Sequence, residues 1–317
     1  KEVALMPTVE LDNFPITKLQ DKISSCVKFL SCRTFCKICT LSKFQQLTLQ
    51  RRSMSSSPRL WPNPPSNSPL PLPKGPILFT NNEIFELDFP DMPKGASINL
   101  EGLREYIGEF RLNNGKFLRE IMDFSNSKPM LIAGELANPY RLCDIMVGNM
   151  PIIPVRLENI CRTYADNLDS REITPGIHHI TIARSIGWWE PSFITLVGLS
   201  EMKKMVSWLD NNNPSTWAPK RLAEGTVRLE NDMMIMAPRI EDVSWDGDEE
   251  SINCNMPSAN GPAIDLSSLI VPINTRQGCY NHRGRIVKCR HHPQTEFHEN
   301  LFRRGSSFKW DKILTYL

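Results

Sequence analysis

The sequence has no long hydrophobic run and none of the short motifs that most readily identify an enzyme. No uncharged apolar run reaches the roughly 18 residues of a membrane-spanning helix, and the longest candidate, Ser192 to Leu199, has the length of a strand. The phosphate-binding Gly-Lys-Ser/Thr loop, the Gly-x-Ser-x-Gly elbow and the Gly-x-Gly-x-x-Gly fingerprint are all absent. These absences remove the commonest nucleoside triphosphatase, hydrolase and dinucleotide-binding interpretations. An enzyme whose residues are scattered along the chain stays open.

The sequence also lacks the features of a secreted protein. Its first residues show no basic-then-apolar leader, and the triplet at Asn213 contains a proline that forbids N-glycosylation. The 9 cysteines are an odd number, so a full set of internal disulfides leaves one thiol unpaired. We therefore expect an intracellular protein, cytoplasmic or nuclear, without a membrane partner.

The net charge is only +2, but it is distributed unevenly. Residues 1–53 hold nine Lys/Arg against four Asp/Glu, and residues 276–304 hold seven against two, so each segment carries +5. Between them, residues 241–250 hold six carboxylates and no cation. Basic ends favour contact with a polyanion, although runs of charge are also typical of ordinary solvated surface.

Proline divides the chain. Of the 25 prolines, eight fall between residues 54 and 76, where they exclude a helix or an inner strand. The predicted organisation is a basic, cysteine-containing N-terminal extension at 1–53, a Pro/Ser-rich linker at 54–76, a core domain at 77–273 and a basic Cys/His element at 274–317.

The hydrophobic pattern predicts interleaved helices and strands without a regular βαβ rhythm, so the expected fold class is α+β. Asn81-Asn82 predicts a hairpin turn between two short strands. The expected strands are 77–80, 83–89, 130–133, 177–183, 192–197, 226–230 and 233–236. The expected helices are 15–30, 41–50, 99–112, 117–124, 155–168 and 201–209, with Ser200 as the N-cap of the last.

A cluster of cysteine and histidine near the C-terminus is the strongest candidate site. Four of the six histidines fall within residues 279–298, beside two cysteines. Thiolates and imidazoles are the usual ligands of structural zinc. The candidate ligands are Cys279, His282, Cys289 and His291, with His292 as an alternative and His298 as a spare. The loop between the two pairs is short for a zinc finger, so ordinary buried or surface side chains are the competing interpretation.

The same stretch predicts a nucleic-acid-binding surface that needs no metal. Cations alternate with small and apolar residues, so a strand there would project several of them from one face. The competing interpretation is a basic edge strand whose charges prevent aggregation. The candidate contacts are Arg276, Tyr280, Arg283, Arg285, Lys288, Arg290, Arg303 and Arg304, with Tyr280 and Phe297 available to stack on bases.

Three other groups carry weaker signals. Cys32, Cys36 and Cys39 have the spacing of an iron–sulfur triplet, and with Cys26 they offer an alternative zinc set, but unpaired structural cysteines are the interpretation that we favour. His178 and His179 are expected on opposite faces of a strand, with Asp169, Glu172 or Glu190 as partners. The tryptophans Trp188, Trp189, Trp208 and Trp217 suit core and interface positions or base stacking, and we expect Trp188 or Trp189 to be exposed.

These patterns predict a non-enzymatic nucleic-acid-binding protein, with RNA as the expected ligand, or a nucleocapsid- or coat-like assembly protein that self-associates. Two alternatives remain open. One is a metal-dependent enzyme that uses the C-terminal Cys/His cluster, with Glu296 or Glu299 moving protons. The other is a protein-interaction adaptor that uses the proline segment and the tryptophans.

Overall fold

A computed structural model describes residues 72–80, 83–168, 178–210, 216–232, 235–275, 278–302, 305–308 and 314–317. The chain divides into two units, Lys1–Ser57 and Pro58–Leu317, and the described residues all belong to the second. The expected helices at 15–30 and 41–50, and all of the expected linker up to residue 71, lie outside the described residues.

The described part of the chain is mostly β-sheet, so the predicted α+β class is wrong. Its main feature is an antiparallel sheet of 11 strands among the described residues, whose longest path runs β11-β8-β5-β1-β2-β3. The strands of this path are β1 (Ile77–Thr80), β2 (Glu83–Asp88), β3 (Arg111–Leu112), β5 (Met150–Leu168), β8 (Thr226–Leu229) and β11 (Ala263–Asp265). The strands that join it beside this path are β4 (Lys128–Leu131), β6 (His178–Val197), β13 (Cys279–His282), β14 (Arg285–Ile286) and β15 (Ser306–Phe308).

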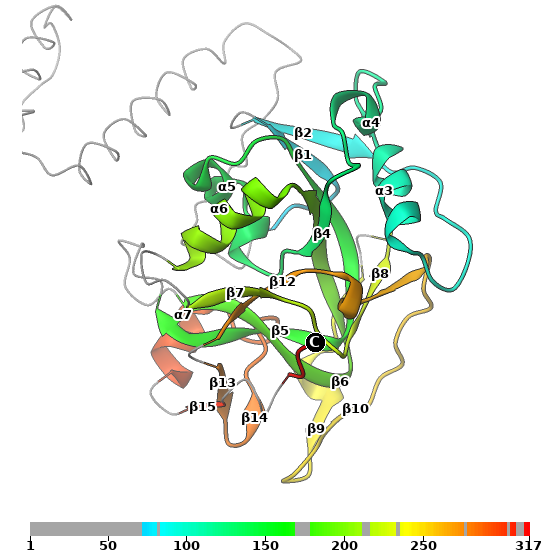
Figure 1. Ribbon diagram of the computed structural model, residues 1–317. Coiled ribbons are helices and arrows are strands. Elements are labelled where there is room, and N and C mark those ends of the chain that lie inside the picture. Colours follow the sequence, from blue (N-terminus) through cyan, green and yellow to red (C-terminus); the bar gives the residue numbers. More distant parts are fainter. Residues whose placement is uncertain are drawn as a thin grey trace, which may run out of the picture. The chain divides into compact units, whose positions relative to one another are not determined.

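Two long strands, β5 and β6, pair with each other and organise the sheet (Figure 1). We predicted a helix at 155–168, but these residues form most of β5. The error has a physical cause: Arg156, Glu158 and Arg162 interrupt the apolar sequence as the exposed residues of a helix would, yet all three are buried in pairs. The separate strands predicted at 177–183 and 192–197 are the two ends of the single strand β6.

A bulge interrupts the β5–β6 ladder near its middle. Glu158 lies opposite Trp189, but Ile160 lies opposite Arg184, so β6 holds extra residues between the two pairs. Asn159 and Gly187 take positive φ angles of 61° and 77°, and the Asn159 side chain accepts a hydrogen bond from the Gly187 backbone nitrogen at 2.9 Å. Bulges of this kind redirect side chains, and this one turns Trp188 into the core.

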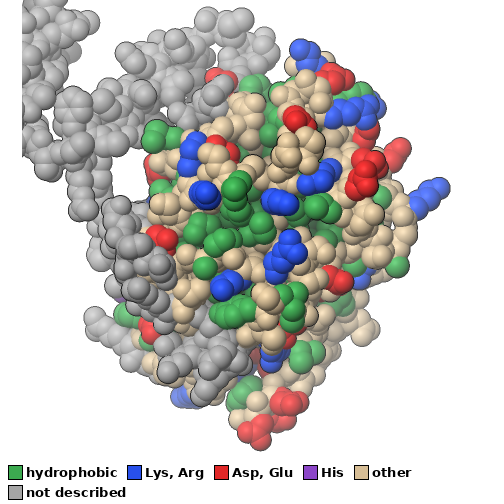
Figure 2. Space-filling view, in the orientation of Figure 1, with side chains coloured by type: hydrophobic (Ala, Val, Ile, Leu, Met, Phe, Trp, Pro, Cys, Tyr) green, Lys and Arg blue, Asp and Glu red, His purple; other side chains and the backbone are tan. Residues whose placement is uncertain are grey.

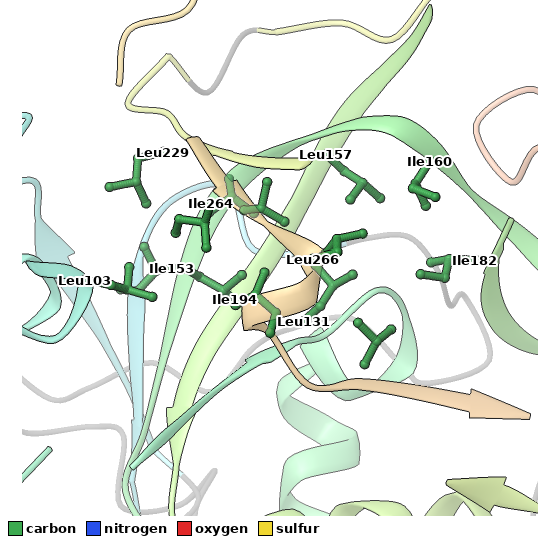
Figure 3. Packing of buried hydrophobic residues seen from close by; sticks show 14 of the residues in the cluster. Leu103, Leu131, Ile153, Leu157, Ile160, Ile182, Ile194, Leu229, Ile264 and Leu266 are labelled. Atoms are coloured by element: carbon green, nitrogen blue, oxygen red, sulfur yellow. The ribbon is translucent and has the colours of Figure 1, made fainter. Parts of the chain in front are cut away.

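Both faces of the central strands are covered. Ile152 and Ile153 are neighbours on β5 but belong to different hydrophobic clusters, and so are Phe193 and Ile194 on β6. Successive side chains of a strand point to opposite faces, so the two clusters lie on the two sides of the sheet. Figure 3 shows part of one cluster, in which Leu131, Ile153 and Ile194 meet Ile264 and Leu266. Burial on both faces explains the continuous apolar run that correctly predicted a strand at 192–197.

The helices are short and pack on this core. Met202, Met205 and Leu209 of α6 join one cluster, and Leu103 and Ile107 of α3 join the other. The Asn99 side chain caps α3, and α3 ends before Arg111 because that residue already belongs to β3. Ser200 lies inside α6 and is not its N-cap. The helical elements here are α3 (Leu100–Gly108), α4 (Leu118–Ile121), η3 (Glu135–Ala137), α5 (Pro139–Ile145) and α6 (Leu199–Asp210).

Most of the remaining elements are short. The predicted hairpin at 77–89 is confirmed as β1 and β2, with Thr80 opposite Glu83. The predicted hairpin at 226–236 is wrong, because β8 pairs with β5 and β11. Two further ladders join β9 to β10 and β7 to β12. The elements not yet named are β7 (Trp217–Lys220), η4 (Ile240–Asp242), β9 (Val243–Trp245), β10 (Glu250–Ile252), η5 (Leu266–Ser268), β12 (Val271–Asn274), α7 (Gln294–Glu296) and η6 (Phe297–Leu301). Among the described residues, no helix has both the length and the apolar character needed to cross a membrane.

Candidate nucleic-acid interface

The basic C-terminal stretch folds into a tight hairpin, not into the single strand that we expected. His282 of β13 lies opposite Arg285 of β14, which leaves Arg283 and Gly284 as a two-residue turn. Their φ angles are 55° and 83°, the combination that matches the twist of a hairpin. Glycine adopts such angles without cost, whereas arginine does not. The turn therefore places the Arg283 guanidinium at the exposed tip of the hairpin.

Several bonds fix this hairpin to the long strand β5. Cys279 of β13 pairs with Ala165 of β5. The Thr163 hydroxyl donates a hydrogen bond to the Val287 carbonyl at 2.7 Å, and the Cys289 backbone nitrogen donates one to the Arg162 carbonyl at 2.9 Å. The basic element is thus an added part of the main sheet, with a fixed position on it.

A group of side chains that we call the Glu250 cluster lies beneath the hairpin: Ser185, Trp188, Glu250, Arg285 and Lys288. The Glu250 carboxylate pairs with the Lys288 ammonium, accepts a hydrogen bond from the Ser185 hydroxyl at 3.2 Å and lies 3.9 Å from Arg285 Nε. The Lys288 nitrogen also lies 4.9 Å from the centroid of a Trp188 ring. Lysine is rarely buried without a partner, and Lys288, at 2% exposure, has both a carboxylate and an aromatic face.

The structure separates the eight predicted nucleic-acid contacts into three groups. Arg283 is exposed, and Arg285 and Arg290 are partly exposed. Lys288 is buried in the Glu250 cluster, and Tyr280 is buried against Phe297, with ring centroids 5.1 Å apart. Arg276, Arg303 and Arg304 lie outside the described residues. Tyr280 and Phe297 therefore form core in this structure, and among the candidates that the structure describes, Arg283, Arg285 and Arg290 are the ones with at least partly exposed side chains.

The four predicted zinc ligands do not form one group. Cys279 and Cys289 are buried, and burial raises the pKa of both thiols well above the usual value. The His291 ring lies 5.1 Å from a Trp188 ring, and its Nε2 atom is 2.9 Å from the Pro238 carbonyl. In the described part of the chain, no three His, Cys, Asp or Glu side chains are placed to hold a metal ion. Cys26, Cys32, Cys36 and Cys39 lie outside the described residues.

His178 and His179 occupy opposite faces of β6, as expected, and of their predicted partners Asp169 and Glu172 lie outside the described residues. His179 Nδ1 lies 3.1 Å from a carboxylate oxygen of Glu135, in the 3₁₀ helix η3. His178 Nε2 lies 3.1 Å from Nδ1 of His298. Burial, followed by the neighbouring charge of His298, lowers the pKa of His178 to about 4. The predicted partner Glu190 belongs to Arg162 instead, and Trp188 and Trp189 are both buried, contrary to our expectation.

Sequence reasoning missed the buried charges of the central strands. Arg156 pairs with Glu158 at 2.8 Å, and Glu158 also accepts a hydrogen bond from Arg228 at 3.0 Å. Arg162 Nε lies 3.3 Å from Glu190 across the β5–β6 ladder. The available signal was the spacing of opposite charges at positions 156 and 158, which share one face of a strand.

Comparisons with known proteins give this chain no relative, since no family model, no curated protein and no solved structure matches it.

Proposed function

We propose that this protein is a non-enzymatic RNA-binding protein that contacts phosphates through the β13–β14 hairpin. The surface involved, which we call the hairpin rim, consists of Arg283, Arg285 and Arg290. The observation that carries the proposal is that Arg283 is exposed and Arg290 partly exposed beside an element that is fixed to the main sheet. Among the described residues, neither Arg283 nor Arg290 makes an ion pair, so both are free to bind an anion.

The chemistry of the rim suits a single-stranded polyanion. Guanidinium groups bind phosphate oxygens through paired hydrogen bonds, and a fixed hairpin loses little conformational freedom on binding. Arg290 Nη2 lies 3.4 Å from the Met236 sulfur, and Met236 is 61% exposed, so the rim has an apolar neighbour against which a base can pack. An intracellular setting and self-association belong to the same proposal.

A salt titration of RNA binding tests this function. The wild-type chain should bind a single-stranded RNA with an affinity that falls as salt rises, because each phosphate contact releases counterions. The double substitution Arg283→Ala/Arg290→Ala should weaken binding by about tenfold at low salt and flatten the log–log slope by about 1.4.

The matched control removes two exposed cations elsewhere, through Lys94→Ala/Lys116→Ala. These lysines precede α3 and follow β3, away from the hairpin. The proposal is rejected if RNA fails to bind at low salt, if its affinity is independent of salt, or if the control variant loses as much affinity as the hairpin variant.

A further inference from the structure

The hairpin rim has an acidic neighbour that the sequence places more than thirty residues away. The β9–β10 hairpin approaches the β13–β14 turn so closely that a Cβ atom on Gly284 would lie 3.2 Å from the Trp245 ring. A Cβ on Gly187, in the β6 bulge, would likewise lie 3.5 Å from the Ile252 side chain. Strands β9 and β10 are therefore packed between the bulge and the basic turn.

Glu250, the first residue of β10, forms ion pairs with cations of the basic stretch. Its carboxylate pairs with Lys288 and lies 3.9 Å from Arg285, one of the three arginines of the rim. A carboxylate that bridges two cations offers them the same charge and the same kind of oxygen acceptors as an RNA phosphate. Arg285 is thus engaged by an internal anion before any ligand arrives.

The tip of the same hairpin carries further carboxylates. Asp246 accepts backbone hydrogen bonds from Asp248 and Glu249, each at 2.8 Å, and so fixes the turn. Asp248 and Glu249 are exposed, and among the described residues neither carboxylate has a cationic partner. Figure 2 shows acidic side chains gathered at this tip, at the lower end of the view.

The tip continues directly from the residue of β9 that packs against the β13–β14 turn. Asp246 directly follows Trp245, and Arg283 directly precedes Gly284, so the charges flank the contact between these two residues. Salt at 0.1 M largely screens the interaction between exposed charges that lie more than a Debye length of about 10 Å apart. Carboxylates there repel an incoming phosphate and lower the positive potential of the rim.

We propose that the β9–β10 hairpin is an autoinhibitory element that competes with RNA phosphates for the hairpin rim. This inference rests on the proposed RNA-binding function. The carboxylates at its tip lower the affinity of the rim for RNA by repelling phosphates. Glu250 lowers it by pairing with Arg285.

The test compares full-length proteins that differ by two charges. Asp248→Asn/Glu249→Gln should tighten RNA binding about twofold to fivefold at low salt, and the gain should shrink as salt rises. The control Glu101→Gln/Glu105→Gln removes two exposed charges from α3 and should leave the affinity unchanged within about twofold, because α3 lies far from this hairpin in Figure 1. Both pairs are exposed, so neither variant removes a buried contact.

The outcomes separate the two proposals. RNA binding by the wild type with an equal or weaker affinity in Asp248→Asn/Glu249→Gln overturns the autoinhibitory role and leaves the RNA-binding function standing. An equal gain in the α3 control also overturns it, because net charge then explains the effect. Failure of the wild type and of both variants to bind RNA overturns the proposed function and the inference together.

Discussion

Arg162 and Glu190 show how single residues constrain this fold. Their side chains are 4% and 0% exposed, and they face each other across the two longest strands. The Glu190 carboxylate also accepts a hydrogen bond from the Arg162 backbone nitrogen. Withdrawing one ion from water costs several kcal/mol, so each charge is tolerated only because the other is present.

Arg162→Met should therefore lower the free energy of unfolding by about 3 to 5 kcal/mol, because it leaves the Glu190 charge buried without its partner. Urea unfolding followed by tryptophan fluorescence measures this loss. Arg119→Met provides the matched control, since Arg119 pairs with Glu109 on the surface with exposures of 54% and 41%. That variant should change the stability by less than about 1 kcal/mol, and similar losses in the two proteins would contradict the argument.

His178 is predicted to make the stability of the protein depend on pH. Its pKa falls from an ordinary 6.5 to about 4 in the folded chain, because it is buried and lies next to His298. Between these values the unfolded chain binds a proton that the folded chain does not, so stability falls as pH falls from 6.5 towards 4. The total loss from this group is about 3 kcal/mol.

Urea midpoints measured between pH 7 and pH 4 test this dependence. His178→Gln removes the titrating ring, so its stability should fall less steeply over the same interval. His291, whose pKa is also lowered by burial, still titrates in that variant and leaves part of the slope. Identical slopes in the variant and the wild type would show that His178 does not contribute.

At the scale of elements, the β13–β14 turn depends on two residues for which a positive φ angle has different conformational costs. Both have positive φ, but Gly284 has no side chain and Arg283 has a long one. Gly284→Ala should destabilise the protein by about 1 to 2 kcal/mol, because alanine is strained at this φ and its Cβ crowds Trp245. Thermal unfolding measures this difference.

Arg283→Gly makes the reciprocal comparison. It relieves backbone strain but adds freedom to the unfolded chain, so stability should change by less than about 1 kcal/mol. It should nevertheless weaken RNA binding, because it removes a cation of the rim. A large loss of stability in Arg283→Gly would show that its side chain has a structural role that the described contacts do not contain.

Local signals predicted local elements well and long-range ones poorly. The Asn81-Asn82 turn and the apolar run at 192–197 each carry their own evidence, and the structure confirms the strands beside them. Strand β5 was predicted as a helix, because its charges are neutralised by residues such as Glu190 and Arg228 that no local pattern identifies. Glu250 lies 38 residues from its partner Lys288, and no local pattern indicated this pairing.

At the scale of the whole molecule, the candidate interface combines distant parts of the chain. The β6 bulge supplies Ser185 and Trp188, β10 supplies Glu250, and the C-terminal hairpin supplies Arg285 and Lys288. The sequence identified the last two as charged candidates but placed the acidic stretch in a separate loop. The fold decides which carboxylate pairs with which cation, because the partners come from strands that are distant in sequence. The accessible charge of the rim therefore could not be predicted from composition.

The pairing of β13 with β5 also determines when the sheet can form during translation. Ala165 of β5 pairs with Cys279, which is made much later, and Leu222 likewise forms an isolated bridge with the distant Tyr316. During synthesis the long strand β5 therefore leaves the ribosome well before its partner β13, and part of one of its edges stays open until β13 is made. Pairings so distant in sequence slow folding and expose strand edges to other nascent chains. A ribosome that stalls before residue 279 would release a product with an open β5 edge, and such fragments should be strong substrates for chaperones.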